Sequence, residues 1–221
     1  MKGDKLLTKE EHTRAAQGIA DLLLPRIAET KGRFIVTIAG ESGSGKSEVA
    51  AIFSRLLAEK GLKSLTFQLD DYFVYPPKTN DKMRRQDIGH VGVSEVRLDL
   101  LDRNLKDIAE GAGEITKPLV DYDEDLISEE TVDLEGINVI IVEGTYTTLL
   151  KNAHRRVFID RTYVDTREVR RDRGREEQDD YLERVLEIEH GIISKHKAAA
   201  DIIVSGDYEV RKATQDDCAG K

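Results

Sequence analysis

Apolar runs alternate with amphipathic stretches along most of the chain. The segment from Phe34 to Ala39 is almost wholly apolar, which is typical of a strand buried on both faces of a sheet. After a glycine-rich turn, apolar residues return at helical spacing: Val49, Ala50, Ile52, Phe53, Leu56 and Leu57. Before the strand, apolar residues three and four apart predict an amphipathic helix over residues 9–30 that covers the sheet, with Pro25 as a candidate kink.

The rest of the chain repeats this alternation. Apolar runs predict further strands over residues 63–69, 137–144, 155–160 and 200–206. The pattern also predicts a helix from Ser94 to Gly111 or Gly113, extended pieces at 114–120 and 131–136, a loop at 76–92 and a charged helical stretch after residue 160. Strands alternating with helices predict an α/β fold with a doubly wound, mostly parallel sheet and helices on both faces.

The turn after the first strand reads GESGSGKS. In such a loop, backbone N–H groups wrap a nucleotide phosphate, Lys46 reaches the β and γ oxygens, and the Ser47 hydroxyl binds Mg²⁺. Its place before a helix N-terminus, whose dipole favours an anion, fits this chemistry. The sequence therefore predicts a P-loop NTPase fold, with the phosphate bound by Gly40, Glu41, Ser42, Gly43, Ser44, Gly45, Lys46 and Ser47.

Carboxylates follow two of the predicted strands. Asp70 and Asp71 come at the end of the strand at 63–69, and Glu143 comes near the end of the run at 137–144. Because ligands of doubly wound sheets bind at the carboxyl ends of the strands, we expect these side chains beside the P-loop. Carboxylates next to a Mg²⁺–nucleotide site raise each other's pKa, whereas the metal lowers both pKa values.

Composition narrows the class of partner. At 221 residues the chain is long enough for one α/β domain, and no linker-like segment divides it. The formal net charge of −9 disfavours nucleic acid, so we expect a small molecule. The N-terminal residues lack the apolar core of a signal peptide, and no apolar run approaches the roughly 20 residues that span a bilayer. We expect one cytoplasmic domain over residues 1–221 that binds no membrane and ends in a polar tail at 207–221. The sequence leaves open whether the chain forms a homo-oligomer.

Three classes of protein share the P-loop: guanine-nucleotide switches, mechanical or transport ATPases, and small-molecule kinases. The sequence contains neither a guanine-reading Asn-Lys-x-Asp nor a transporter Leu-Ser-Gly-Gly-Gln. Its late arginine-rich stretch favours a kinase, because phosphoryl transfer depends on positive charge around the moving group. Between residue 33 and about 206, the chain resembles the uridine kinase, phosphoribulokinase and pantothenate kinase group. The matching segments are GESGSGKS, LDDYFVYP, KPLVDYD, VIIVEG, DTREVRR and EIEHGIISKHKAAADIIV.

The resemblance implies roles for the carboxylates. Aligning DDYFVYP on the family pattern Asp-x-Phe makes Asp71 the base that accepts the proton of the acceptor hydroxyl, with Asp70 as the alternative. Lys46 belongs to the catalytic set. Asp70, Ser47 and, through water, Glu143 are implied to hold Mg²⁺.

The resemblance also implies a lid and its following helix over about residues 161–190. Arg167, Arg170 and Arg171 share one helical face, so we expect them to close on the triphosphate, with Arg170 and Arg171 acting in catalysis. The alternative is an exposed, solvated face, because acidic residues are interspersed. Only Asp172 separates Arg171 from Arg173-Gly174-Arg175, which is a shorter spacing than in the family. The sequence therefore leaves open whether Arg173 or Arg175 reaches the nucleotide.

The acceptor segment departs from the uridine kinase pattern. Val120, Asp125 and Ile127 stand where uridine kinases have an aromatic residue, a His and an Arg. A site that lacks these groups no longer recognises the base and ribose of a nucleoside by hydrogen bonds. This favours a small polyol, a sugar or a cationic acceptor over uridine. The residues expected to contact the acceptor are Asp71, Tyr72, Asp87, His90, Asp121 and Tyr122.

The sequence thus predicts an ATP- and Mg²⁺-dependent kinase that phosphorylates a hydroxyl of a small metabolite. The alternatives are a true uridine/cytidine kinase and a nucleotide-binding protein without small-molecule kinase activity.

Overall fold

A six-stranded sheet forms the centre of the computed structural model, which describes residues 6–173 and 179–218. The strand order is β2-β5-β1-β6-β7-β8, and every neighbouring pair is parallel except β7 with β8. These strands are β1 (Phe34–Gly40), β2 (Ser64–Gln68), β5 (Val139–Glu143), β6 (Arg155–Ile159), β7 (Ile202–Val204) and β8 (Val210–Lys212). The predicted doubly wound, mostly parallel sheet is confirmed.

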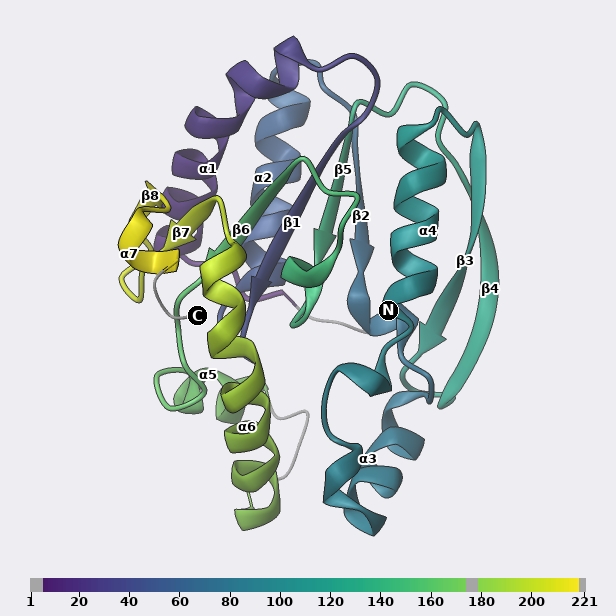
Figure 1. Cartoon of the computed structure of the whole chain (residues 1–221), viewed down its shortest axis with the longest axis vertical. Coiled ribbons are helices and arrows are strands. Elements are labelled where there is room, and N and C mark those ends of the chain that lie inside the picture. The colour runs from purple at the N-terminus through teal and green to yellow at the C-terminus, as the bar shows by residue number, and fades with distance from the viewer. Residues whose placement is uncertain (1–5, 174–178, 219–221) are drawn as a thin grey trace.

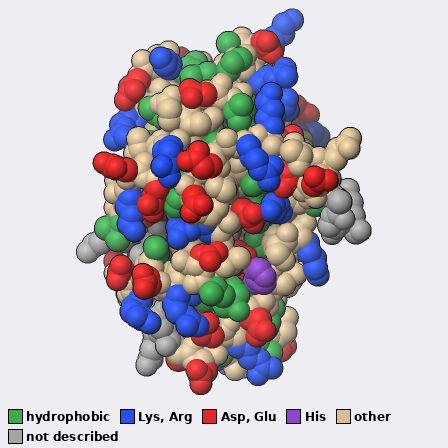
Figure 2. All heavy atoms as spheres, turned by 90° about the vertical axis from the view of Figure 1, so that its left-hand side faces the viewer, with side chains coloured by type: hydrophobic (Ala, Val, Ile, Leu, Met, Phe, Trp, Pro, Cys, Tyr) green, Lys and Arg blue, Asp and Glu red, His purple; other side chains and the backbone are tan. Residues whose placement is uncertain are grey.

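Helices cover both faces of this sheet (Figure 1). The helices are α1 (Glu10–Glu29), α2 (Lys46–Glu59), α3 (Pro77–Gln86), α4 (Leu98–Ala109), α5 (Arg167–Arg173), α6 (Asp180–Ile193) and α7 (Gln215–Cys218). α1 and α2 pack on one face and α4 on the other. On the side of the molecule that carries α1, acidic and basic side chains are interspersed (Figure 2).

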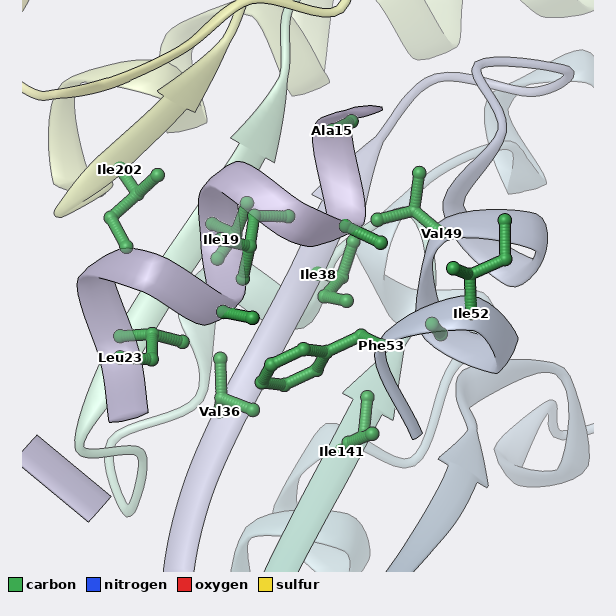
Figure 3. Packing of buried hydrophobic residues seen from close by; sticks show 14 of the residues in the cluster. Ala15, Ile19, Leu23, Val36, Ile38, Val49, Ile52, Phe53, Ile141 and Ile202 are labelled. Atoms are coloured by element: carbon green, nitrogen blue, oxygen red, sulfur yellow. The ribbon is translucent and has the colours of Figure 1, made fainter. Parts of the chain in front are cut away.

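The core lies in two layers because the central strands are apolar on both sides. Along β1, Val36 and Ile38 join the cluster under α1 and α2, whereas Ile35 joins the cluster under α4. In Figure 3, Phe53 of α2 packs between Val36 and Ile141. Each such side chain contributes roughly 1.5–3 kcal/mol when fully buried, so β1 is held rigidly from both faces. The P-loop therefore starts from a rigid strand.

Two segments differ from their predicted form. The polar segment 76–92 contains α3, which the hydrophobic pattern missed because the helix has no apolar stripe and is held by polar contacts. The expected polar tail at 207–221 contains β8 and the buried Tyr208. The extended pieces around the acidic turn form an antiparallel hairpin, β3 (Glu114–Asp121) with β4 (Leu126–Asp133), which lies beside α4 (Figure 1).

Candidate active site

The P-loop runs from the carboxyl end of β1 to the first turn of α2. Gly40, Gly43 and Gly45 have φ angles of 152°, 76° and 89°, which L side chains rarely adopt. Lys46 Nζ donates a hydrogen bond to the carbonyl oxygen of Glu41 at 2.9 Å, so the ammonium group lies over the loop. A glycine-rich turn of this form, leading into a helix N-terminus, presents backbone N–H groups to an anion.

Ser47, Asp70 and Glu143 meet beside this loop, because β5 lies between β1 and β2 in the sheet. Ser47 Oγ donates to Glu143 Oε1 at 3.2 Å. Burial, and then the charge of Asp70, raises the pKa of Glu143 to about 7. Burial also raises the pKa of Asp70, against the opposing charge of Lys46. A buried Glu143 and a half-buried Asp70 that repel each other form a local environment that a cation stabilises.

The adjacent aspartates have different surroundings. Asp70 lines a cleft that begins at the P-loop. Asp71 is 2% exposed, and its carboxylate accepts hydrogen bonds from Lys117 Nζ at 2.9 Å and from the Val120 N–H at 3.1 Å. Within the described residues, Asp71 is not part of the cleft lining. The structure thus brings Asp70 to the P-loop and ties Asp71 to strand β3, and the choice of the base between them stays a prediction.

The cleft has a volume of about 220 Å³ and continues from the P-loop to a space between α3 and α6. These two helices lie beyond the carboxyl ends of the strands, toward the bottom of Figure 1. The P-loop end is lined by Ser42, Gly43, Lys46, Ser47, Asp70 and Glu143. The far end combines rings with polar groups, among them Tyr75, Asn80, Arg84, Tyr122, Tyr181 and Glu189. A phosphate-binding end and a polar, ring-lined end therefore share one space.

Arg84 joins the two walls of the far end. Its guanidinium donates to both carboxylate oxygens of Glu95, at 2.5 and 3.0 Å, and to Glu189 Oε1 at 2.9 Å. The fully buried Glu95 also accepts from the Asn80 amide at 2.7 Å and the Gly92 N–H at 2.6 Å. Burial lowers the pKa of Arg84, but the charge of Glu189 and the hydrogen bond to Glu95 outweigh it and raise this pKa above its usual range. The network fixes the distance between α3 and α6.

Arg170 supports the P-loop from outside the cleft. It is 5% exposed and donates to the Tyr163 carbonyl oxygen at 2.6 Å and to Thr166 Oγ1 at 2.7 Å. Thr166 Oγ1 in turn donates to the carbonyl oxygen of Ser42 at 2.8 Å. The start of α5 is thereby attached to the loop.

The other predicted lid arginines lie elsewhere. Arg167 pairs with Glu183 of α6 at 2.8 Å, and Arg171 is exposed. In the described part of the chain, neither they nor Arg170 line the cleft, so the expected common face toward the triphosphate is not seen in this arrangement. Arg175, and the side chain of Arg173, lie outside the described residues.

Comparison with known proteins decides the family. The model of the Phosphoribulokinase / Uridine kinase family matches residues 35–175, well over half of the chain. This chain belongs to that family. The resemblance inferred from the sequence segments is confirmed.

Individual relatives differ in how much of them the chain covers. The uridine kinase of Macrococcus caseolyticus is 33% identical over 187 residues, which cover 77% of this chain and 86% of that protein. A bifunctional alpha-galactosidase/sucrose kinase of Mediterraneibacter gnavus is 28% identical over 194 residues, which cover 81% of this chain and 21% of that protein. The chain spans about a fifth of the length of this second relative.

The fold of the family is also found among solved structures. The D-glycerate 3-kinase of Cryptococcus neoformans gives a TM-score of 0.63 at 16% identity, covering 90% of this chain and 99% of that chain. This likeness concerns the fold. Among the described residues, no helix combines the length and the apolar character needed to cross a membrane.

Of the residues expected to contact the acceptor, Tyr122 lies in the cleft and His90 lies beside it. Tyr122 is part of its lining. His90 contacts the lining residue Asn80, with 3.3 Å between Nε2 and Oδ1, and its ring lies 5.9 Å from that of Tyr75.

Three further acceptor candidates have other partners. Tyr72 is fully buried and its hydroxyl donates to Asn104 Oδ1 at 3.4 Å. Asp87 is exposed and accepts from the Gly89 N–H at 2.9 Å. Asp121 accepts from two backbone N–H groups of the β3–β4 turn. These side chains stabilise local structure outside the cleft.

Sequence reasoning missed two histidines near the P-loop. His190 Nδ1 lies 2.7 Å from Glu41 Oε1, and Glu41 Oε2 accepts from the Tyr163 N–H at 2.6 Å. His12 lies behind the loop, where burial lowers its pKa. The sequence did contain a signal that His12 is buried: it lies seven residues before Ile19 on α1 and therefore on the same, buried face of the helix. For His190 the pattern gave no signal, because its partner is 149 residues away.

Proposed function

We propose that this chain is an ATP- and Mg²⁺-dependent kinase that transfers the γ-phosphoryl group to a hydroxyl of a small sugar or polyol. One observation carries the proposal: Lys46, Ser47, Asp70 and Glu143 lie at one end of a cleft whose other end is lined by polar groups and rings. Relatives named as a uridine kinase and as a bifunctional alpha-galactosidase/sucrose kinase support phosphoryl transfer to a hydroxyl.

The P-loop end fits a magnesium-bound triphosphate. The backbone N–H groups and Lys46 suit phosphate oxygens. Ser47 Oγ and the carboxylates of Asp70 and Glu143 are oxygen donors of the kind that Mg²⁺ takes, with water and phosphate completing its shell. The pKa of about 7 at Glu143 fits a carboxylate whose compensating cation is external to the chain. When bound, the nucleotide supplies the phosphoryl group and Mg²⁺ neutralises its charge.

Asp70 is the proposed base. It lines the cleft, whereas the carboxylate of Asp71 is held by Lys117 and a backbone N–H. Its place between the P-loop and the far end of the cleft suits a base that faces the acceptor hydroxyl. Asp70 takes the proton of the acceptor hydroxyl. The hydroxyl oxygen bonds to the γ-phosphorus, and the bond between this phosphorus and the oxygen that bridges to the β-phosphate breaks. Lys46 stabilises the charge that remains on the leaving diphosphate.

The β3–β4 hairpin supports a compact acceptor rather than uridine. Val120 is fully buried, and Ile127 is its partner across the hairpin. Asp125 accepts from Thr79 Oγ1 and from the Lys78 N–H, both at 2.7 Å, and thereby anchors the start of α3. Side chains used in this way are not available to stack on a pyrimidine or to bind it by hydrogen bonds.

The far end of the cleft offers groups suited to hydroxyls. The network of Asn80, Arg84 and Glu189 makes this wall of the cleft polar, and Tyr122 and Tyr181 add ring faces with polar edges. Rings and converging hydrogen-bonding groups are the usual means by which small polar ligands are oriented.

The test is ADP release by the full chain against a panel of sugars, polyols, hydroxy acids, uridine and cytidine at saturating Mg-ATP. Lys46→Ala, prepared in parallel, measures contaminating kinases. We expect the best sugar or polyol to exceed uridine in kcat/KM by about 10⁴-fold, the scale set by lost polar contacts. A kcat/KM for uridine of about 10⁴ M⁻¹s⁻¹ or more would instead establish a uridine kinase. ATP binding without turnover on any acceptor would favour a nucleotide-binding protein.

A further inference from the structure

A tyrosine distant in the sequence reaches the back of the P-loop. Tyr208 lies in the turn between β7 and β8, is 2% exposed, and has its hydroxyl 3.0 Å from the carbonyl oxygen of Ser44. Its φ angle of 61° is rare for a bulky residue and costs roughly 1–3 kcal/mol. The Tyr208 N–H donates to the Ser205 carbonyl oxygen at 2.9 Å, which closes the turn. This strained turn directs the ring at the loop.

Two donors determine where the Tyr208 hydroxyl points. Arg161 Nη1 donates to Tyr208 Oη at 2.6 Å, and His12 Nε2 lies 3.2 Å from the same oxygen. His12 Nδ1 accepts from the Lys9 N–H at 3.1 Å, so the neutral ring carries its proton on Nε2 and donates it to Tyr208. With both lone pairs of the phenol oxygen occupied, its proton is directed to the Ser44 carbonyl oxygen.

The Ser44 carbonyl and the Gly45 N–H belong to one peptide unit. In a planar trans peptide these groups point in opposite directions. A carbonyl held toward Tyr208 therefore turns the Gly45 N–H to the other side of the loop, and the bond to the carbonyl also polarises that N–H. A Cβ at Gly45 would lie 2.8 Å from Tyr208 Oη and 3.0 Å from His12 Nε2, so glycine is what allows this close support.

The packing of α1 on β8 brings the supporting groups together. A Cβ at Gly18 would lie 2.8 Å from Val210 Cβ, so the small residue lets the helix and the strand approach. Arg14 adds a hydrogen bond from Nη2 to the Asp207 carbonyl oxygen at 2.7 Å. The helix that carries His12 is thus attached to the turn that carries Tyr208.

We propose that Tyr208 is a positioning residue, which with Arg161 and His12 orients the Ser44–Gly45 peptide so that the Gly45 N–H binds a nucleotide phosphate. The inference rests on the proposed function, since it requires a bound triphosphate. Tyr208 acts through the backbone of the loop and needs no contact with the nucleotide.

Tyr208→Phe is the test, because it removes the hydroxyl and leaves the ring. Tyr146→Phe is the matched control: Tyr146 is 1% exposed, belongs to the core under α4, and its hydroxyl has no hydrogen-bond partner among the described residues. The measurements are calorimetric affinities for ATP and for inorganic tripolyphosphate, KM for ATP, kcat and the unliganded melting temperature. Tripolyphosphate has no base or ribose, so it reports on the loop alone.

We expect Tyr208→Phe to weaken ATP and tripolyphosphate alike by about tenfold, on the scale of one hydrogen bond to a charged group. KM for ATP rises by a similar factor, kcat at saturating ATP is kept, and Tyr146→Phe changes neither affinity by more than about twofold. Wild-type affinity of Tyr208→Phe for tripolyphosphate would overturn the proposal, and if ATP alone were weakened the hydroxyl would be contacting the nucleoside.

A second variant keeps the proposal testable if Tyr208→Phe does not fold. Arg161→Gln keeps the ring and the hydroxyl but removes a donor, and we expect it to weaken tripolyphosphate by about threefold. Unchanged binding in this folded variant would refute the proposal even if Tyr208→Phe does not fold. If the wild-type chain itself bound neither ATP nor tripolyphosphate, the proposed function would fail, and that result is distinct from a failure confined to the variants.

Discussion

Replacing each adjacent aspartate by asparagine separates a structural carboxylate from a catalytic one. Asp71→Asn deletes one charge of a buried pair, in which the side chains of Lys117 and Asp71 are 6% and 3% exposed. Removing one partner of such a pair typically costs about 3–5 kcal/mol. Glu130 Oε1 stays 2.7 Å from Lys117 Nζ and is 38% exposed, so it compensates part of the ammonium charge. We therefore expect a loss of about 2–3 kcal/mol.

Asp70→Asn has the opposite signature. Burial raises the pKa of Asp70, which means that its charge opposes folding, so the neutral amide leaves the melting temperature unchanged or raises it. As the proposed base, Asp70 contributes about 10²–10⁴-fold to kcat, and its loss lowers turnover by that factor. The affinity for metal-free ATP is kept, because the P-loop is intact.

Calorimetric melting and ADP release measure both effects on the same preparations. For a chain of this size, the loss in Asp71→Asn corresponds to a fall in Tm of roughly 5–10 °C. Asp107→Asn, at an exposed position of α4, is the control and should match the wild type in both assays. The reasoning is refuted if Asp71→Asn melts like the wild type but loses turnover while Asp70→Asn stays within threefold of the wild-type kcat. That result would return the role of base to Asp71.

Three further predictions concern the same site. Lys46→Ala should abolish detectable turnover and weaken Mg-ATP binding, and unchanged calorimetric affinity and rate would contradict the phosphate-binding role. Because the folded-state pKa of Glu143 is raised to about 7 from an ordinary 4.5, its contribution to the stability of the metal-free chain is complete below pH 4.5 and lost as the pH rises through 7. Mg²⁺ should therefore raise Tm more at pH 8 than at pH 6, and Glu143→Gln should remove that difference. Arg170→Ala should lower both Tm and turnover, because Arg170 supports the P-loop, whereas the exposed Arg171→Ala should leave Tm unchanged and lower kcat only if the lid closes on the triphosphate. An early-melting Arg170→Ala with full turnover would favour a purely structural role.

The parts of the fold with a periodic apolar pattern were predictable from the sequence. The strand at Phe34–Gly40, the P-loop and the helix after it follow from a run, a glycine spacing and a helical stripe. Helix α3 was not predictable in this way, because polar contacts such as Asn80 to Glu95 stabilise it and such contacts leave no periodic signal.

The choice between Asp70 and Asp71 shows why part of the site was not predictable. Asp70 and Asp71 lie in a 3₁₀ turn, Leu69–Tyr72, that follows β2, and in such a turn of about three residues consecutive side chains point in different directions. A short motif with two consecutive aspartates fits in either register, and the partner that distinguishes them, Lys117, lies 46 residues further along the chain. Contacts of this kind are specified by tertiary packing rather than by local pattern.

The support behind the P-loop has a consequence for folding order. Its hydrogen bonds join residues 164 positions apart for Tyr208 with Ser44 and 196 apart for His12 with Tyr208. Closing loops of that length is entropically unfavourable until other contacts have formed, so such pairs assemble late. During synthesis, β1, the P-loop and α2 emerge long before residue 208 is available. We expect this segment of the nascent chain to form a strand–turn–helix with low affinity for nucleotide. ATP should therefore stabilise the completed domain and not its folding intermediates.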